Sequence, residues 1–198
     1  MYGIKEYDGF NYSGEYDDKK RIVLTHTSRN LDEYLTSLKK RRYGKNLNIP
    51  HYVIGRDGFI HKLLSHDKYS EYLDEKSINR SSIVISLENL GWLEKEPLKD
   101  YHLNWIGDIY KGKVFEKKWR DRHFWEPYTE DQIISLLKLL TDITEETGIE
   151  FNVVEHNTLI KKIEKYGGVV TRSNFSKIYT DLNPSFDFEK FLKKIENE

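Results

Sequence analysis

The chain has 198 residues, a length that suits a single domain. It contains 32 lysines and arginines against 33 aspartates and glutamates, which gives a net charge of -1 at pH 7. This balance argues against a general nucleic-acid-binding protein, because such proteins carry a clear basic excess. There is no cysteine, so disulfide bonds and thiolate metal ligands are excluded. A zinc site would have to use histidine and carboxylate side chains.

The apolar content predicts a packed core but no membrane-spanning segment. Hydrophobic residues make up 37% of the sequence and aromatic residues 14%, and large aromatic side chains can supply much of a core. No run approaches the ~18 consecutive apolar residues that indicate a transmembrane helix. Residues 1–6 lack the basic segment and apolar run of a signal peptide. We therefore expect cytoplasmic synthesis without such a signal.

The first part of the chain predicts an arm, a strand and a helix. Residues 1–20 are polar and aromatic, and we expect them to form an arm that lies over the domain. The apolar run that follows predicts a buried strand over residues 21–26, which ends on His26. Asn30 is a favourable N-cap for a helix whose apolar residues recur at helical spacing as far as Leu38.

A hairpin and a second buried strand come next. The apolar runs at residues 51–54 and 59–63 flank Asp57-Gly58, and an Asp-Gly pair in this setting indicates a tight hairpin turn. Residues 82–87 carry apolar side chains on both faces, which is typical of a central strand. This strand leads into a polar segment that begins at Glu88.

Residues 92–128 differ in composition from their surroundings. They contain all four tryptophans, and the segment 111–122 is basic. Short alternating pieces in this range predict a β-hairpin insertion. Two interpretations remain open for it: a surface excursion held by its own aromatic side chains, or a wall of a substrate groove.

The last third predicts two helices and another strand. Thr129 and Gln132 form a capping box for a long helix that ends at Gly148. Residues 151–154 predict a strand that leads to His156, and a short last helix buries the C-terminus. The alternation of strands and helices predicts an α/β fold, a sheet with helices packed on it, in a single domain over residues 1–198.

Two histidines and one aspartate suggest a metal site. His26 and His156 each follow a predicted strand, and Asp181 lies shortly before the last helix. Two imidazoles and one oxygen ligand with an open fourth position form a typical catalytic zinc site. Zinc in such a site lowers the pKa of a bound water to about 7. Three interpretations stay open for the third ligand: Asp181, the nearby Asn183, or none, with Asp181 capping a turn.

The order of sequence blocks gives a further indication. The segment 22–27 is followed by the block His51-Tyr52-Val53-Ile54-Gly55-Arg56-Asp57-Gly58, then by the strand block 82–91, by His156 and by the segment 183–187. This order resembles the zinc-dependent N-acetylmuramoyl-L-alanine amidase family, which includes phage lysozyme-type amidases and peptidoglycan recognition proteins. The resemblance covers residues 20–197, with 92–128 as an insertion, and the Asn-Pro-Ser-Phe-Asp tail is most similar to the phage members.

The resemblance implies a mixed central β-sheet flanked by helices, with zinc in a surface groove. It implies hydrolysis of the amide between N-acetylmuramic acid and L-alanine in peptidoglycan. His26 and His156 match the family's histidine ligands, His51 matches the histidine of the hairpin block, and Asn89 matches the end of the strand block.

The sequence departs from the family pattern at the third ligand and at the general base. Asn183 stands where members have cysteine or aspartate before the proline, and Asp181 lies two residues upstream. Ser86 stands at the glutamate used as a general base. Glu88 lies two residues further on and on the same strand face, so it is a candidate replacement.

The sequence thus predicts a phage-type cell-wall amidase that acts on peptidoglycan after phage lysis, from a virion, or in recycling. The predicted roles are zinc ligation (His26, His156, Asp181), catalysis (Glu88, His51) and substrate binding (Asn89, Trp92, Trp119, Trp125, Arg172). One alternative is a catalytically inactive peptidoglycan-binding module. Another is a virion structural protein with the same fold that associates with other virion proteins.

Overall fold

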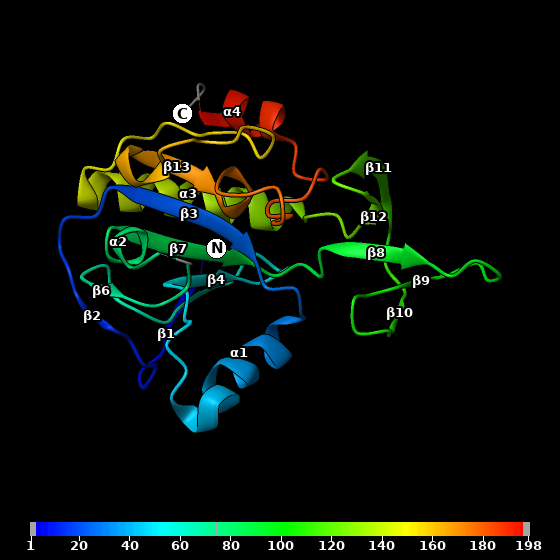
Figure 1. Cartoon of the computed structure of the whole chain (residues 1–198), viewed down its shortest axis with the longest axis horizontal. Helices are drawn as coiled ribbons and strands as arrows, with labels where there is room; N and C mark the ends of the chain where they lie inside the picture. The colour runs from blue at the N-terminus through cyan, green and yellow to red at the C-terminus, as the bar shows by residue number, and fades with distance from the viewer. Residues whose placement is uncertain (1–2, 74, 196–198) are drawn as a thin grey trace.

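A mixed six-stranded sheet forms the centre of the computed structural model, which describes residues 3–73 and 75–195 (Figure 1). The strand order is β1 (Ile4–Glu6), β5 (Ile60–Lys62), β4 (Tyr52–Ile54), β7 (Ser82–Leu87), β3 (Arg21–His26) and β13 (Gly168–Thr171). β4 and β5 are antiparallel, and the other neighbouring pairs are parallel. Every residue of β3 and β7 is buried, as the sequence predicts for these strands.

The register brings the carboxyl ends of three parallel strands to one edge of the sheet. His26 of β3 pairs with Leu87 of β7, and Thr171 of β13 pairs with Leu24 of β3. Arg172, the residue after Thr171, therefore lies beside the end of β3, close in register to His26. Ligand sites commonly form at this edge of an open α/β sheet.

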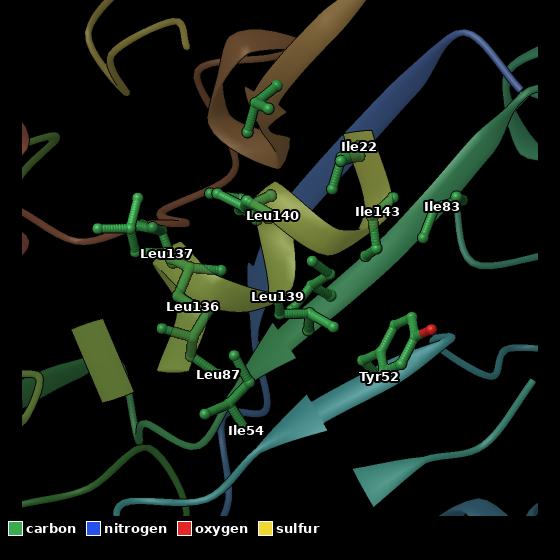
Figure 2. Close-up of a cluster of buried hydrophobic side chains, with 14 of the residues drawn as sticks. Ile22, Tyr52, Ile54, Ile83, Leu87, Leu136, Leu137, Leu139, Leu140 and Ile143 are labelled. Carbon is green, nitrogen blue, oxygen red and sulfur yellow. The ribbon is translucent and has the colours of Figure 1, made fainter. Parts of the chain in front are cut away.

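Helices cover both faces of the sheet because side chains alternate along β3. Ile22 points toward the long helix α3 (Glu130–Thr147) and packs with Leu140 and Ile143 (Figure 2). Val23 points to the opposite face and packs with Ile78 of α2 (Lys76–Arg80).

The remaining helices extend these two layers. α4 (Phe188–Ile195) lies on the α3 side, where its Phe191 joins the same core. α1 (Leu31–Lys40) packs through Leu38 against Val53 of β4. Three short 3₁₀ helices complete the set: η1 (Arg41–Gly44), η2 (Ile163–Lys165) and η3 (Arg172–Asn174).

The predicted helix caps are confirmed. The Asn30 side chain accepts a hydrogen bond from the backbone N–H of Glu33 at the start of α1. Thr129 and Gln132 form a reciprocal capping box at the start of α3. Gly148 ends α3 with φ 71°, a left-handed conformation that glycine adopts at little cost.

The insertion forms a separate five-stranded antiparallel sheet beside the strand ends of the main sheet (Figure 1). Its order is β10 (Ile109–Tyr110), β9 (His102–Leu103), β8 (Trp92–Lys95), β12 (Arg122–Trp125) and β11 (Phe115–Trp119). The sequence predicted only a hairpin in this range. Pairing of β8 with β12 extends the hairpin into a sheet.

Two sequence-based predictions need correction. The arm is part of the fold, because β1 joins the main sheet and β2 (Gly14–Glu15) pairs with β6 (Lys68–Tyr69). Residues 1–2 of the predicted arm, like residues 196–198, lie outside the described residues. The strand predicted over 151–154 is reduced to one bridge between Val153 and Val169. β13 takes the place beside β3 instead.

Within the described residues, no helix combines the length and apolar character needed to cross a bilayer.

Candidate functional site

The imidazole of His26 is buried at the end of β3. Its Nδ1 lies 3.1 Å from the Ser28 hydroxyl, and its Nε2 has no hydrogen-bond partner among the described residues. Burial lowers its pKa below the ordinary value, with Asp181 opposing the shift. Gly91 covers the ring: a Cβ there would lie 2.8 Å from Cε1 of His26. Only glycine allows this approach.

Asp181 lies beside His26 and is tied to it through the backbone. Its Oδ1 accepts a hydrogen bond of 2.9 Å from the backbone N–H of His26 and lies 3.5 Å from Nε2 of the same residue. Arg172 donates from Nε to Oδ2 at 3.0 Å and from Nη2 to Oδ1 at 3.2 Å. Burial alone would raise the pKa of the Asp181 carboxyl, but Arg172 and His26 outweigh it and the pKa is lowered. Asp181 is therefore an ionised, fully buried partner of Arg172.

Arg172 is held in place by the sheet and by aromatic rings. It follows directly after Thr171, the last residue of β13. Its guanidinium lies 4.7 Å from the ring centroid of Tyr179 and 5.9 Å from that of Tyr72. Burial works to lower its pKa, but Asp181 raises it above the ordinary value, so the side chain stays charged.

These side chains open onto a groove of about 430 Å³. His26, Asp181 and Arg172 lie in its lining. The lining also includes two further arginines and five aromatic side chains: Arg29, Arg41, Tyr34, Tyr72, Trp92, Trp105 and Tyr179. Such a groove can bind a ligand that combines apolar or sugar surfaces with negative charge.

His156 occupies different surroundings. Its ring packs edge-on against Trp119, at 4.7 Å between centroids, and tilted against Phe188, at 5.1 Å. Nδ1 is buried without a hydrogen-bond partner in the described part of the chain. Burial, followed by Lys117 and Arg120, lowers its pKa to about 4. His26 and Asp181 share one groove, and His156 is outside the described lining of that groove.

Asn183 also has a structural environment. It is fully buried, and its amide nitrogen donates to Oδ1 of Asn89 at 3.0 Å and to the carbonyl of Glu126 at 3.1 Å. Its amide oxygen accepts from the backbone N–H of Ser185 at 2.9 Å. Both ends of the amide are used, so Asn183 is not available as a ligand in this arrangement.

The residues present do not fit the three-ligand zinc site that the sequence suggested. In residues 3–73 and 75–195, no three His, Cys, Asp or Glu side chains are arranged to hold a metal ion. The unpartnered nitrogens of His26 and His156 are what a metal would use. However, both oxygens of Asp181 already accept hydrogen bonds from Arg172. The guanidinium of Arg172 is thus already paired with the carboxylate that a metal would need as its anionic ligand.

The structure gives the two predicted catalytic side chains structural roles. Glu88 accepts from the backbone N–H of Leu31 at the start of α1 and from that of Arg56, both at 2.9 Å. His51 donates from Nε2 to the carbonyl of Lys68 and accepts from the backbone N–H of Val84, both at 3.0 Å. These bonds occupy both carboxylate oxygens of Glu88 and both ring nitrogens of His51. A catalytic role for either residue stays a prediction.

Of the predicted substrate-binding residues, Trp92 and Arg172 line the groove. Trp125 is fully buried, so its ring offers a ligand no exposed surface in this arrangement, and its binding role stays a prediction. Asn89 is also fully buried, and its amide bonds to the carbonyl of Glu126 at 3.0 Å. Trp119 donates to Asn157 at 2.6 Å beside His156.

Sequence reasoning missed Trp105 and Tyr72 as groove residues. Trp105 is 41% exposed and donates from Nε1 to the carbonyl of Ser28. Arg29 lies 4.9 Å above its ring. The insertion thus reaches the groove through Trp105, which supports the interpretation of the insertion as a wall. The position of Trp105 in the tryptophan-rich insertion was a usable signal in the sequence, whereas nothing local in the sequence marks Tyr72.

Arg120 is a third missed residue, at the tip of the β11–β12 hairpin. It donates to the carbonyls of Ser173 and Ser176, both at 3.0 Å, and to those of His156 and Tyr179. One guanidinium thereby joins the insertion to the loop that carries Asp181.

The fold is shared with solved structures. It is similar to that of LysC, an N-acetylmuramoyl-L-alanine amidase from Clostridium intestinale (14% identity over 99% of both chains, TM-score 0.59). It is similar to that of the amidase AmiD from E. coli in complex with anhydro-N-acetylmuramic acid-L-Ala-D-gamma-Glu-L-Lys (19% identity over 93% of this chain and 60% of that one, TM-score 0.59). A third similar structure is an endolysin from a Thermus scotoductus bacteriophage (14% identity, 96% and 97% coverage, TM-score 0.50). The chain therefore has the mixed α/β fold of these amidases, as predicted.

A family model described as N-acetylmuramoyl-L-alanine amidase matches residues 15–167. No curated protein matches the chain. The chain belongs to the N-acetylmuramoyl-L-alanine amidase family, which confirms the resemblance seen in the sequence. The match ends at residue 167, before Arg172 and Asp181. These two residues lie in the segment where the site departs from the predicted ligand set.

Proposed function

We propose that this protein binds fragments of bacterial peptidoglycan, with the groove at His26 as the binding site. The observation that carries the proposal is the groove itself: arginines and aromatic side chains, among them the exposed Trp105, line it at the strand ends of an amidase-family fold. Aromatic rings suit sugar rings, and arginines suit the carboxylates of a stem peptide. AmiD, a structure of similar fold, holds a muramyl peptide.

Hydrolysis of the amide between N-acetylmuramic acid and L-alanine is the second candidate function. It is favoured by family membership and by the unpartnered nitrogens of His26 and His156. It requires a zinc site that the side chains around His26 do not form in this arrangement. A phage-type lytic role on the cell wall belongs to this second candidate.

Isothermal titration of the full chain with MurNAc-L-Ala-γ-D-Glu-L-Lys, with and without EDTA, tests binding. Measuring new L-alanine amino termini in the same mixtures tests hydrolysis. We expect saturable binding that is unchanged by EDTA, and no release of new L-alanine amino termini. Trp105→Ala removes an exposed groove ring and should weaken binding by roughly tenfold. Leu98→Ala, a matched change of an exposed side chain on the insertion, should leave it unchanged. Absence of binding would refute the first candidate, and zinc-dependent release of L-alanine termini would establish the second.

A further inference from the structure

We propose that Arg172 takes the place of a metal ion in this groove and anchors a carboxylate of the bound peptide. This inference rests on the proposed binding of peptidoglycan fragments and identifies the group of the ligand that is recognised. It follows from the position of Arg172, its pairing with Asp181, and the charge of the groove.

The position of Arg172 is fixed by the main sheet. Thr171 pairs with Leu24 in the parallel register of β13 and β3, so Arg172 starts beside the end of the strand that carries His26. The sequence predicted that a second imidazole would lie near His26. The neighbouring strand instead delivers a guanidinium to this edge.

Asp181 is the group that a cation at this place would need. The carboxylate is 1% exposed, and its two contacts from Arg172 form a planar fork at 3.0 and 3.2 Å. A bidentate pair of this kind fixes the orientation of the guanidinium. A divalent ion bound to Asp181 would have to displace Arg172 or sit beside its positive charge. The pair therefore satisfies the buried carboxylate without a metal.

The guanidinium remains partly accessible on the groove side. A guanidinium has five N–H donors, and Asp181 accepts from two of its nitrogens. The Arg172 side chain is 24% exposed and lines the groove. It can therefore donate to a ligand while Asp181 holds it in place.

The charge of the groove selects an anionic ligand. Within the described lining, Arg29, Arg41 and Arg172 are cationic and Asp181 is the acidic side chain. Because Asp181 is already paired with Arg172, the groove carries a net positive charge. The protein as a whole has a net charge of -1, so this excess is local. The carboxylates of a stem peptide match it.

The first part of the test measures metal binding and does not depend on peptide binding. The full chain is treated with EDTA, equilibrated with zinc, freed of excess metal and analysed for zinc content. We expect the unaltered chain to retain almost none. Arg172→His frees Asp181 and places an imidazole beside His26, and we expect it to retain about one zinc per chain. One zinc per unaltered chain, lost in His26→Ala, would overturn the proposal. Failure of Arg172→His to gain zinc would count against it.

The second part measures the anchoring role with MurNAc-L-Ala-γ-D-Glu-L-Lys and its counterpart with amidated carboxylates. Arg172→Lys keeps the charge beside Asp181 but loses the fork, and we expect it to weaken binding about tenfold or more. The double variant Arg172→Gln with Asp181→Asn leaves no buried unpaired charge and should show the same loss. Lys177→Gln, in the same loop but exposed, is the matched control and should stay within about twofold.

Amidation should weaken binding by the unaltered chain and have little effect on the Arg172 variants. Folded Arg172 variants that bind as tightly as the unaltered chain would overturn the anchoring role. If no form of the protein binds either peptide, the proposed function and the anchoring role both fail, and the zinc measurement alone decides whether Arg172 replaces a metal.

Discussion

His26 and His156 have the same signature in the sequence, and both rings are buried with one nitrogen unpartnered in the described part of the chain, but their neighbours differ. Each follows an apolar run that predicts a strand. His26 ends a fully buried strand and lies beside Asp181. His156 follows a segment with a single bridge at Val153 and packs between Trp119 and Phe188. An apolar run thus placed a histidine at the end of a fully buried strand for His26 but not for His156, because the run before His156 pairs with the sheet at a single residue.

The largest expected effect concerns the His26 side, where Asp181→Ala removes the buried carboxylate that pairs with Arg172. A buried charge pair that loses one member costs about 3 kcal/mol or more, and the backbone N–H of His26 loses its acceptor as well. Urea unfolding should show a lower midpoint. Asp18→Ala, at an exposed pair with Lys20, should cost less than about 0.5 kcal/mol. Equal effects of the two changes would contradict the central place given to Asp181.

The next effect concerns the His156 side. His156→Ala removes a buried ring between two aromatic side chains and should cost about 2 kcal/mol, with a change in tryptophan fluorescence from Trp119. His156→Phe preserves ring packing and should cost less than about 1 kcal/mol. If His156 has a packing role, peptide binding should survive the change to phenylalanine. Loss of binding in a folded His156→Phe protein would place His156 in the site and remove the contrast with His26.

The pH dependence of stability gives an effect of similar size at His51, which has a structural role. Burial lowers its pKa from 6.5 to about 3, so between these values the unfolded chain binds a proton that the folded chain does not. Stability from His51 is complete above pH 6.5 and is lost as the pH falls toward 3. Between pH 7 and 5 the loss should be about 2 kcal/mol. Urea titrations of His51→Gln should show a dependence on pH that is shallower by about this amount. An unchanged slope would contradict the burial of a neutral imidazole at His51.

The smallest effect concerns Arg120, which links the two regions. Arg120→Gln removes most of its bonds to the loop at residues 173–179, and because the side chain is half-buried the loss of stability should be about 1 kcal/mol. Amide hydrogen exchange should speed up in this loop and in the hairpin tip. Lys118→Gln, an exposed change on the adjoining strand β11, should leave exchange unaltered. Unaltered exchange in Arg120→Gln would mean that other contacts hold the loop.

Local signals predicted much of the fold. The capping box at Thr129, the N-cap at Asn30 and the left-handed end of α3 at Gly148 each depend on nearby residues alone. The strand at residues 82–87 was predictable because apolar side chains fall on both of its faces, and both faces are indeed buried. The family resemblance was also readable, since its blocks lie within single strands and turns.

The sequence by itself determined the elements, the α/β class and the place of His26 at a strand end, because these follow from periodicity and caps over a few residues. The tertiary structure decided which strand stands beside β3. The short apolar pair Val169-Val170 becomes β13 only by pairing with β3, and that pairing places Arg172 near His26. It also decided the state of Asp181, since a carboxylate buried against a guanidinium nine residues away in the chain depends on how the loop folds back. Contacts between distant segments, which no local pattern encodes, thus set the chemistry of this groove.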